Sequence, residues 1–158
     1  DGLGVEKFFD EKKIIPDDTR SIKEGAIKPW ETKVFGRQKK IFIETINLIL
    51  KEFSIDIKTP WKNLPLKIKT IILNGDENNQ IRELNNFKGI INYIDKKYSE
   101  SERWWVQYEL EKYLSERDCE VCNGYRLNEK ALALKIDNEH IGSVTKKSIS
   151  NCLLWFKN

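Results

Sequence analysis

Two cysteines at a metal-binding spacing are the residues of this sequence best suited to chemistry. Cys119 and Cys122 form a CxxC motif that is followed by Asn123-Gly124-Tyr125-Arg126. A CxxC turn points two thiolates at one ion, and a structural zinc ion usually takes four ligands as two such pairs. Because the sequence contains a single CxxC motif, it supplies half of a zinc site.

Two other interpretations of these cysteines stay open. The motif could serve thiol redox chemistry, although that use expects a helix to open at the motif, whereas here a helical pattern ends before it. The zinc site could instead be completed within the chain by His140 and Cys152, the other soft ligands of the sequence. However, Cys152 lies on the apolar stripe of a predicted helix, where a free cysteine usually acts as a small hydrophobe.

The first residues extend the zinc hypothesis. Asp1-Gly2-Leu3-Gly4 is a Gly-rich stretch of the kind that follows the Cys pair of a zinc knuckle and lets the backbone fold back under the metal. The sequence has no Met and no apolar leader segment. We therefore expect an internal piece of a longer protein, with the second Cys pair just before residue 1.

Composition places the chain in a reducing compartment. Three cysteines in a Lys-, Ile- and Asn-rich sequence do not suggest a secreted disulfide framework, so we expect a cytoplasmic protein. No apolar run approaches the roughly 18 residues of a membrane helix, and we expect no membrane partner. The sequence also lacks a Walker A loop, a GxSxG elbow and an HExxH motif, and it has one His. We expect no catalytic residues in this segment.

Charge is distributed unevenly along the chain. The net charge is +3, yet residues 28–74 carry ten Lys and Arg against four Asp and Glu, between flanks that are net acidic. Basic residues alternate there with aromatic ones, a pattern that can neutralise phosphates while rings stack or wedge. The alternative is an ordinary solvated helix face with the aromatics in the core. Arg103-Trp104-Trp105 poses the same choice, and helical geometry predicts that one Trp packs and the other stays partly exposed.

Hydrophobic periodicity predicts a mainly helical α+β fold. Short strands are expected at Val5–Phe9 and Lys12–Ile15, with a third extended piece at Ala26–Trp30. Apolar spacing predicts helices within 35–53 and from Pro65 to Asn74-Gly75, and Thr59-Pro60-Trp61 resembles a helix start. A polar loop should follow at Asp76–Asn79.

The second half of the chain predicts a helical hairpin and then a β-hairpin with a helix. The stripe Phe87, Ile90, Ile91, Ile94 and Tyr98 marks one helix, and the capping box Ser99-x-x-Glu102 starts another that runs to about Glu116. Beyond the Cys pair, Ala131–Ile136 alternates like a strand and Asp137-Asn138-Glu139 turns it. Ser148 should cap a final helix.

Ordered motifs along the whole chain resemble the UvrA family, the damage-sensing ABC-type ATPase subunits of bacterial excinuclease. The resemblance begins at Asp1-Gly2-Leu3-Gly4-Val5-x-x-Phe8-Phe9-Asp10. It continues through Glu24-Gly25-Ala26-Ile27-x-x-Trp30, Thr59-Pro60-Trp61-x-x-Leu64, Phe87-x-Gly89-Ile90-Ile91, Tyr98-x-Glu100-Ser101-Glu102, Glu109-Leu110-Glu111-Lys112-Tyr113-Leu114, Cys119-x-x-Cys122-x-Gly124-x-Arg126-Leu127 and the closing residues 141–156.

The resemblance implies a domain organisation. Residues 1–6 would be the edge of a zinc module, residues 7–117 a DNA-facing insertion domain, and residues 118–158 the returning half of the zinc module and the start of the signature domain. Zinc would be complete only in the longer parent protein. Two departures stand out: the Cys pair before Asp1 is absent, and Asp76–Leu84 looks shorter than the family's usual hairpin.

The resemblance also implies a function in nucleotide excision repair and the SOS response. The segment would bind damaged duplex DNA by shape and phosphate contacts, because a scanner must accept any base sequence. ATP binding and hydrolysis, homodimerisation and contact with UvrB would belong to the parent. The candidate DNA contacts are Lys39, Lys40, Lys96, Lys97 and Arg103.

Two alternatives of other classes remain. The segment could be a protein-interaction module for a repair partner such as UvrB, with its basic residues serving solubility. It could also be a free-standing zinc scaffold that uses His140 and Cys152.

Overall fold

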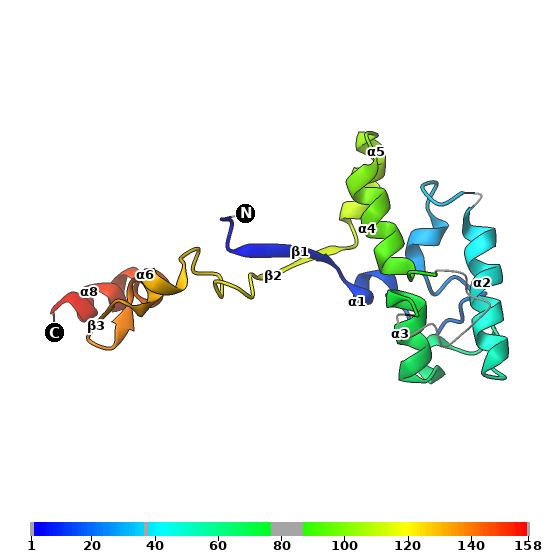
Figure 1. Cartoon of the computed structure of the whole chain (residues 1–158), viewed down its shortest axis with the longest axis horizontal. Helices are drawn as coiled ribbons and strands as arrows, with labels where there is room; N and C mark the ends of the chain where they lie inside the picture. Colours follow the sequence, from blue (N-terminus) through cyan, green and yellow to red (C-terminus); the bar gives the residue numbers. More distant parts are fainter. Residues whose placement is uncertain (1, 37, 77–86, 158) are drawn as a thin grey trace. The chain divides into compact units, whose positions relative to one another are not determined.

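The chain folds into two compact units joined by a pair of strands. The computed structural model describes residues 2–36, 38–76 and 87–157 (Figure 1). Unit 1 combines Asp1–Phe8 with Glu116–Asn158, and unit 2 comprises Phe9–Ser115. Unit 2 is therefore a continuous stretch of chain whose two ends both continue into unit 1.

Strands β1 (Val5–Phe9) and β2 (Leu114–Asp118) pair with one another. The N–H of Cys119 donates to the carbonyl of Gly4, and the N–H of Asp10 donates to the carbonyl of Tyr113, each over 3.0 Å. Residue numbers run in opposite directions along the pair, so the strands are antiparallel. The prediction of a strand at Val5–Phe9 is confirmed, whereas β2 was missed within a predicted helix.

The chain from Asp10 to Glu31 contains helical turns where short extended pieces were predicted. Helix α1 (Glu11–Ile14) replaces the strand expected at Lys12–Ile15, because the Asp10 carboxylate accepts from the N–H of Lys12 and caps the turn. The 3₁₀ turn η1 (Lys28–Glu31) replaces the extended piece at Ala26–Trp30. Pro29 favours this turn because its fixed φ suits a first helical position.

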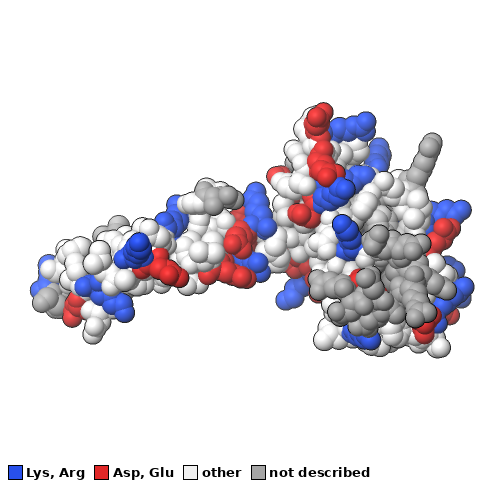
Figure 2. Space-filling view, viewed as in Figure 1, with Lys and Arg blue, Asp and Glu red and all other residues white. Residues whose placement is uncertain are grey.

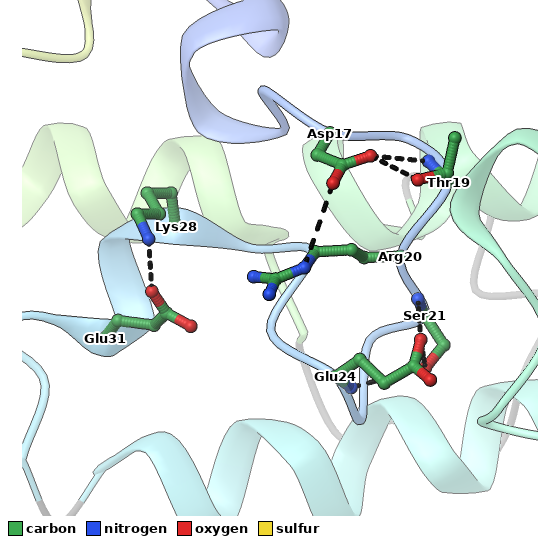
Figure 3. Close-up of polar contacts among 7 residues, drawn as sticks. All are labelled: Asp17, Thr19, Arg20, Ser21, Glu24, Lys28 and Glu31. Carbon is green, nitrogen blue, oxygen red and sulfur yellow. Dashed lines mark hydrogen bonds and ion pairs between the residues drawn. The ribbon is translucent and has the colours of Figure 1, made fainter.

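Local polar contacts hold the irregular chain between α1 and η1 (Figure 3). Ser21 is fully buried; its N–H and hydroxyl both donate to Glu24 Oε2 over 2.9 Å, and the Glu24 N–H donates back to Ser21 Oγ over 3.2 Å. Asp17 accepts from the N–H and hydroxyl of Thr19, and Lys28 pairs with Glu31. The capping-box pattern of Ser21 and Glu24 thus closes a turn here without starting a helix.

The remaining elements of unit 2 are short helices around one apolar core. They are α2 (Gln38–Glu52), the 3₁₀ turn η2 (Trp61–Asn63), α3 (Leu66–Asn74), α4 (Ile90–Glu100) and α5 (Trp104–Glu111). The helical stripes predicted for α2, α3 and α4 are confirmed, since Ile46, Ile49, Leu50, Ile68, Ile72, Ile90 and Ile94 are all buried at 1% exposure or less. The helix start predicted at Thr59-Pro60-Trp61 is only η2, with Pro60 at its N-cap.

The end of α3 lies directly against the start of α4. Gly75, at φ +101°, ends α3, and Gly89, at φ +85°, precedes α4. A Cβ on Gly75 would lie 2.6 Å from the carbonyl carbon of Lys88, and one on Gly89 would lie 2.3 Å from that of Asn74. Both positions therefore require glycine. The loop predicted at Asp76–Asn79 and the shortened segment at Asp76–Leu84 lie, beyond Asp76, outside the described residues.

The boundary between α4 and α5 differs from the predicted capping box. Ser99 does not start a helix because α4 continues through Glu100; the second helix begins at Trp104, with Arg103 at its N-cap. It ends at Glu111, not Glu116, because the following residues form β2. The Ser99 hydroxyl donates to the Lys96 carbonyl within α4, as a mid-helix serine does.

Unit 1 contains a β-hairpin flanked by short helices. Helix α6 (Glu129–Ala133) occupies the first half of the strand predicted at Ala131–Ile136, because the Asn128 side chain accepts from the Ala131 N–H and caps it. The end of the predicted strand, Lys135–Ile136, is confirmed as a strand. Strands β3 (Lys135–Ile136) and β4 (Glu139–His140) pair across a turn at Asp137 and Asn138, both at positive φ. Helices α7 (Ile141–Thr145) and α8 (Ile149–Lys157) follow, and Ser148 caps α8 as predicted by accepting from the Asn151 N–H.

The architecture of the described residues is mainly helical with two small antiparallel sheets. The apolar core comprises residues of unit 2 from Phe9 to Tyr113. None of the helices in 2–36, 38–76 and 87–157 combines the length and apolar character of a membrane span.

Replacing Ser21 by Ala should lower the free energy of unfolding by about 1 to 2 kcal/mol, because it removes the hydroxyl that closes the 21–24 turn inside the core. Denaturation in urea measures this change. Ser99→Ala is the matched control, since its exposed hydroxyl only bonds within α4, and it should cost less than about 0.5 kcal/mol. Equal effects of the two substitutions would contradict the role of Ser21.

Acid should destabilise the fold through its hydrogen-bonded carboxylates. The Ser115 hydroxyl and the Lys12 N–H hold the pKa of Asp10 below its ordinary 3.8, and the N–H and hydroxyl of Ser21 hold the pKa of Glu24 below 4.5. The unfolded chain takes up these protons first, so the stability is present above the ordinary pKa values of these carboxyls and is lost as the pH falls through their lowered pKa values in the folded chain. The urea midpoint should drop over this range, and less steeply in Ser115→Ala. A midpoint that rises on acidification would be inconsistent with these bonds.

Candidate functional site

The Cys pair of unit 1 lies in a tight turn at the end of β2. Cys119 is tied to Gly4 by its N–H, and the Tyr125 N–H donates to the Cys122 carbonyl over 2.8 Å. Asn123, Gly124 and Arg126 all have positive φ, as a chain folding back under its own sulfurs requires. A hydrogen bond from the Arg126 N–H is the main cause that lowers the pKa of the Cys122 thiol. This geometry favours thiolate and suits half of a zinc knuckle.

The described residues do not complete a metal site around these sulfurs. They include no group of three or more His, Cys, Asp or Glu side chains placed to hold a metal. His140 caps α7 by accepting from the Ser143 N–H at Nδ1 over 3.0 Å, and its ring packs edge-on against Tyr125 at 4.7 Å. Cys152 is half-buried on α8. The structure therefore does not assemble the set of Cys119, Cys122, His140 and Cys152.

Unit 2 contains a groove of about 790 Å³. It is lined by residues of α4 and α5, by Phe42 of α2, and by the segments that precede α2 and α4. Among the described residues that line it, the charged side chains are mainly basic, and Glu100 is the one carboxylate. The cations are Lys33, Lys88, Lys96, Lys97 and Arg103. Such a surplus of positive charge in a concave surface favours an anionic ligand. We call this feature the basic groove.

The basic groove gathers three of the five predicted contact residues. Lys96 and Lys97 lie on α4, and Arg103 lies at the N-cap of α5, so all three face one cavity. Lys39 and Lys40 are near the start of α2 and are not part of its lining.

The groove also contains Lys33 and Lys88, which the sequence did not rank as contacts. Lys33 stood in the stretch of alternating basic and aromatic residues, and Lys88 lies inside the motif Phe87-x-Gly89. Those local patterns could have drawn attention to each residue. Nothing in their spacing could have shown that the fold brings them together.

The groove cations differ in the contacts that they already make within the protein. Lys97 is the most constrained: its Nζ donates to Gln38 Oε1 over 2.9 Å and lies 5.8 Å from the ring centres of Phe35 and Tyr93. Lys96 lies 3.8 Å from Glu100, an exposed pair that contributes little. Within the described part of the chain, Lys33, Lys88 and Arg103 have no carboxylate within 4.0 Å.

The visible face of unit 2 carries both signs of charge. Figure 2 shows Lys and Arg side chains interspersed with Asp and Glu over this surface, with no single sign covering it. Lys40, for example, lies beside Glu44 on α2. The basic groove is thus a local concentration of positive charge on a mixed surface.

Aromatic rings line the same groove. Phe42, Phe87, Tyr93 and Trp105 contribute to its wall, and all four are only partly buried. Phe42 packs edge-on against Tyr93 at 4.6 Å and stacks on Trp30 at 5.6 Å, which holds the rings in place.

The two adjacent tryptophans of α5 separate as helical geometry predicted. Trp104 is 76% exposed, whereas Trp105 packs against the core and lines the groove. Only one of them therefore belongs to the candidate site.

Known proteins resemble this chain across nearly its whole length. A family model described as the UvrA DNA-binding domain matches residues 10–112. UvrABC system protein A of Rickettsia bellii is 37% identical over 99% of this chain and 17% of that protein. The protein of the same name from Bradyrhizobium diazoefficiens is 33% identical over 99% of this chain and 16% of its own length. The chain thus spans about a sixth of these relatives.

A solved structure shares the fold. The crystal structure of UvrA2 from Deinococcus radiodurans matches 98% of this chain and 21% of that chain, with a TM-score of 0.61 and 20% sequence identity. At this identity the likeness bears on the fold alone.

The purified 158-residue chain should hold far less than one zinc ion per molecule, because two thiols without further ligands bind zinc weakly. Metal analysis after dialysis against a mild chelator measures the content. The control is His140→Ala, which should change nothing. Stoichiometric zinc that disappears in His140→Ala would contradict the observed geometry and support the free-standing scaffold.

Proposed function

This chain belongs to the UvrA family, and from that premise we propose that it is the DNA-binding segment of a longer nucleotide excision repair protein. Unit 2 would bind duplex DNA through phosphate contacts, without reading base edges. The matching family model is that of a DNA-binding domain, and the residues that it matches fall entirely within unit 2.

The observation that carries this proposal is the basic groove. Its described lining has five cations and one carboxylate, and three of the cations have no carboxylate partner among the described residues. Flexible Lys and Arg side chains at a groove rim neutralise phosphates irrespective of base sequence, and each neutralised phosphate releases counterions. Damage would be sensed through the deformability of the duplex, which a protein reads without base contacts.

Zinc would be held at the Cys pair in the longer protein. Cys119 and Cys122, with backbone N–H groups directed at sulfur, fit two of the four ligand positions of a structural zinc site. The ion would fix the backbone at the end of β2. The other two ligands would come from elsewhere in the parent protein.

The activities of the whole protein lie outside this segment. We propose a cytoplasmic parent that binds and hydrolyses ATP as an ABC-type ATPase, forms a homodimer and cooperates with UvrB. The segment itself contributes no nucleotide-binding motif. Residues 7–117 would be its DNA-facing insertion, and residues 1–6 and 118–158 the two parts of the adjoining zinc and signature modules.

Exposed apolar residues favour a second function for unit 1. On α8, three apolar residues at helical spacing are exposed: Ile149 by 90%, Phe156 by 72% and Leu153 by 56%. An apolar helix face of this kind normally packs against protein. Unit 1 would therefore contact protein, either the remainder of its own chain or a repair partner, while unit 2 contacts DNA.

Binding of duplex DNA should weaken steeply with salt and depend on the groove. Fluorescence anisotropy with two duplexes of unrelated sequence should give similar affinities. The double variant Lys96→Gln, Arg103→Gln should lower the slope of log affinity against log salt by about 2, because two phosphate contacts are lost.

The matched control removes the same charge from α2. Lys39→Gln with Lys40→Gln should leave the slope close to that of the unaltered chain. A salt-independent affinity would refute phosphate binding, and an equal loss in both double variants would refute the groove as its site.

A further inference from the structure

The aromatic rings that line the basic groove have no role in binding phosphate. Cations alone suffice for duplex phosphates, yet Phe42, Phe87, Tyr93 and Trp105 line the same cavity and keep part of their surface exposed. Exposed rings beside unpaired cations are the combination with which proteins hold single-stranded nucleic acid: rings stack on bases, and cations follow the backbone. The groove therefore offers a binding mode that a paired duplex cannot use.

We propose that the basic groove takes an unpaired nucleotide of DNA, with its base against the aromatic wall and its phosphate against the cations. This inference rests on the proposed DNA binding and adds to it the form of DNA that the site prefers. In a paired duplex, neighbouring bases cover both faces of each base, so none is free to stack on a side chain. A distorted duplex exposes such a face.

The size of the groove agrees with this ligand. Its volume of about 790 Å³ is within the range of roughly 300 to 1,000 Å³ that holds compact small ligands. One or two nucleotides fit such a space, whereas a duplex can only lie across its rim. Any duplex can then make phosphate contacts at the rim of the groove, whereas an unpaired nucleotide can enter its interior.

The arrangement of cation and ring is fixed before a ligand arrives. Lys97 is held at Gln38 and over the face of Tyr93, and Tyr93 packs against Phe42. Arg103 and Trp105 line the same groove from the start of α5. Such preorganisation lowers the entropic cost of ordering a flexible strand.

Helix α5 supplies a matched pair of variants. Trp105 lines the groove, whereas its neighbour Trp104 is exposed and does not. Trp105→Leu removes a ring from the proposed stacking wall, and Trp104→Leu removes one from the same helix outside it. Neither substitution alters the charge of the groove.

The test compares a fully paired duplex with the same duplex carrying a short central bubble, by anisotropy at one salt concentration. The unaltered chain should bind the bubble more tightly. Trp105→Leu should lower affinity for the bubble about tenfold more than it lowers affinity for the paired duplex, which is the size of one lost base stack. Trp104→Leu should change neither. Thermal melting confirms that each variant is folded. If Trp105→Leu does not fold, Phe87→Leu takes its place, and its loss of affinity for the bubble is compared with its loss for the paired duplex in the same way.

The outcomes separate this inference from the proposed function. Equal affinity for bubble and paired duplex, or equal losses in Trp104→Leu and Trp105→Leu, would overturn the unpaired-nucleotide site while leaving duplex binding intact. Absence of binding to either DNA would overturn both.

Discussion

The pairing of β1 with β2 is the constraint on which unit 2 depends. It brings together two points that are roughly a hundred residues apart in sequence, and closing a loop of that length costs on the order of 4 kcal/mol in chain entropy. Several contacts at the start of unit 2 offset this cost. The Asp10 N–H donates to Tyr113, the Asp10 carboxylate accepts from the Ser115 hydroxyl, and Lys13 Nζ donates to the Leu114 carbonyl. Asp10 therefore both caps α1 and ties it to the strand by which the chain leaves the unit.

The basic groove is a product of this closed unit. Its walls come from chain segments that are distant in sequence: Lys33 before α2, Lys88 before α4, two lysines on α4 and Arg103 at α5. Gly75 and Gly89 allow α3 and α4 to meet backbone to backbone, which sets where α4 begins and where its cations face. The positions of the groove cations, of the aromatic rings and of the groove itself thus depend on how the core packs and not on any local sequence motif.

Local signals predicted the strand β1 and the longer helices α2, α3 and α4 well, and several short elements poorly. Spacing of apolar residues predicted α2, α3 and α4, because each buries one stripe in the core. β2 was missed because Leu114–Asp118 is mostly polar and exposed, so it lacks the alternation of a half-buried strand. α1 was predicted as a strand because its single turn is too short to show a period, and Asp10 acts as its cap only once the chain turns there.

The site was predictable in part. The resemblance identified the family, and the comparisons confirm it. Lys96, Lys97 and Arg103 were named as contact candidates, and the structure places them in one groove, whereas Lys39 and Lys40 lie outside it. Which lysines share a cavity depends on tertiary packing, which sequence periodicity does not encode.

Lysine footprinting of the chain by acetylation and mass spectrometry, with and without duplex DNA, shows whether DNA binds in the basic groove. DNA should protect Lys88 and Lys96 in the basic groove and leave Lys39 and Lys40 on α2 as reactive as before. Protection of the α2 lysines with unchanged reactivity in the groove would contradict binding in the basic groove.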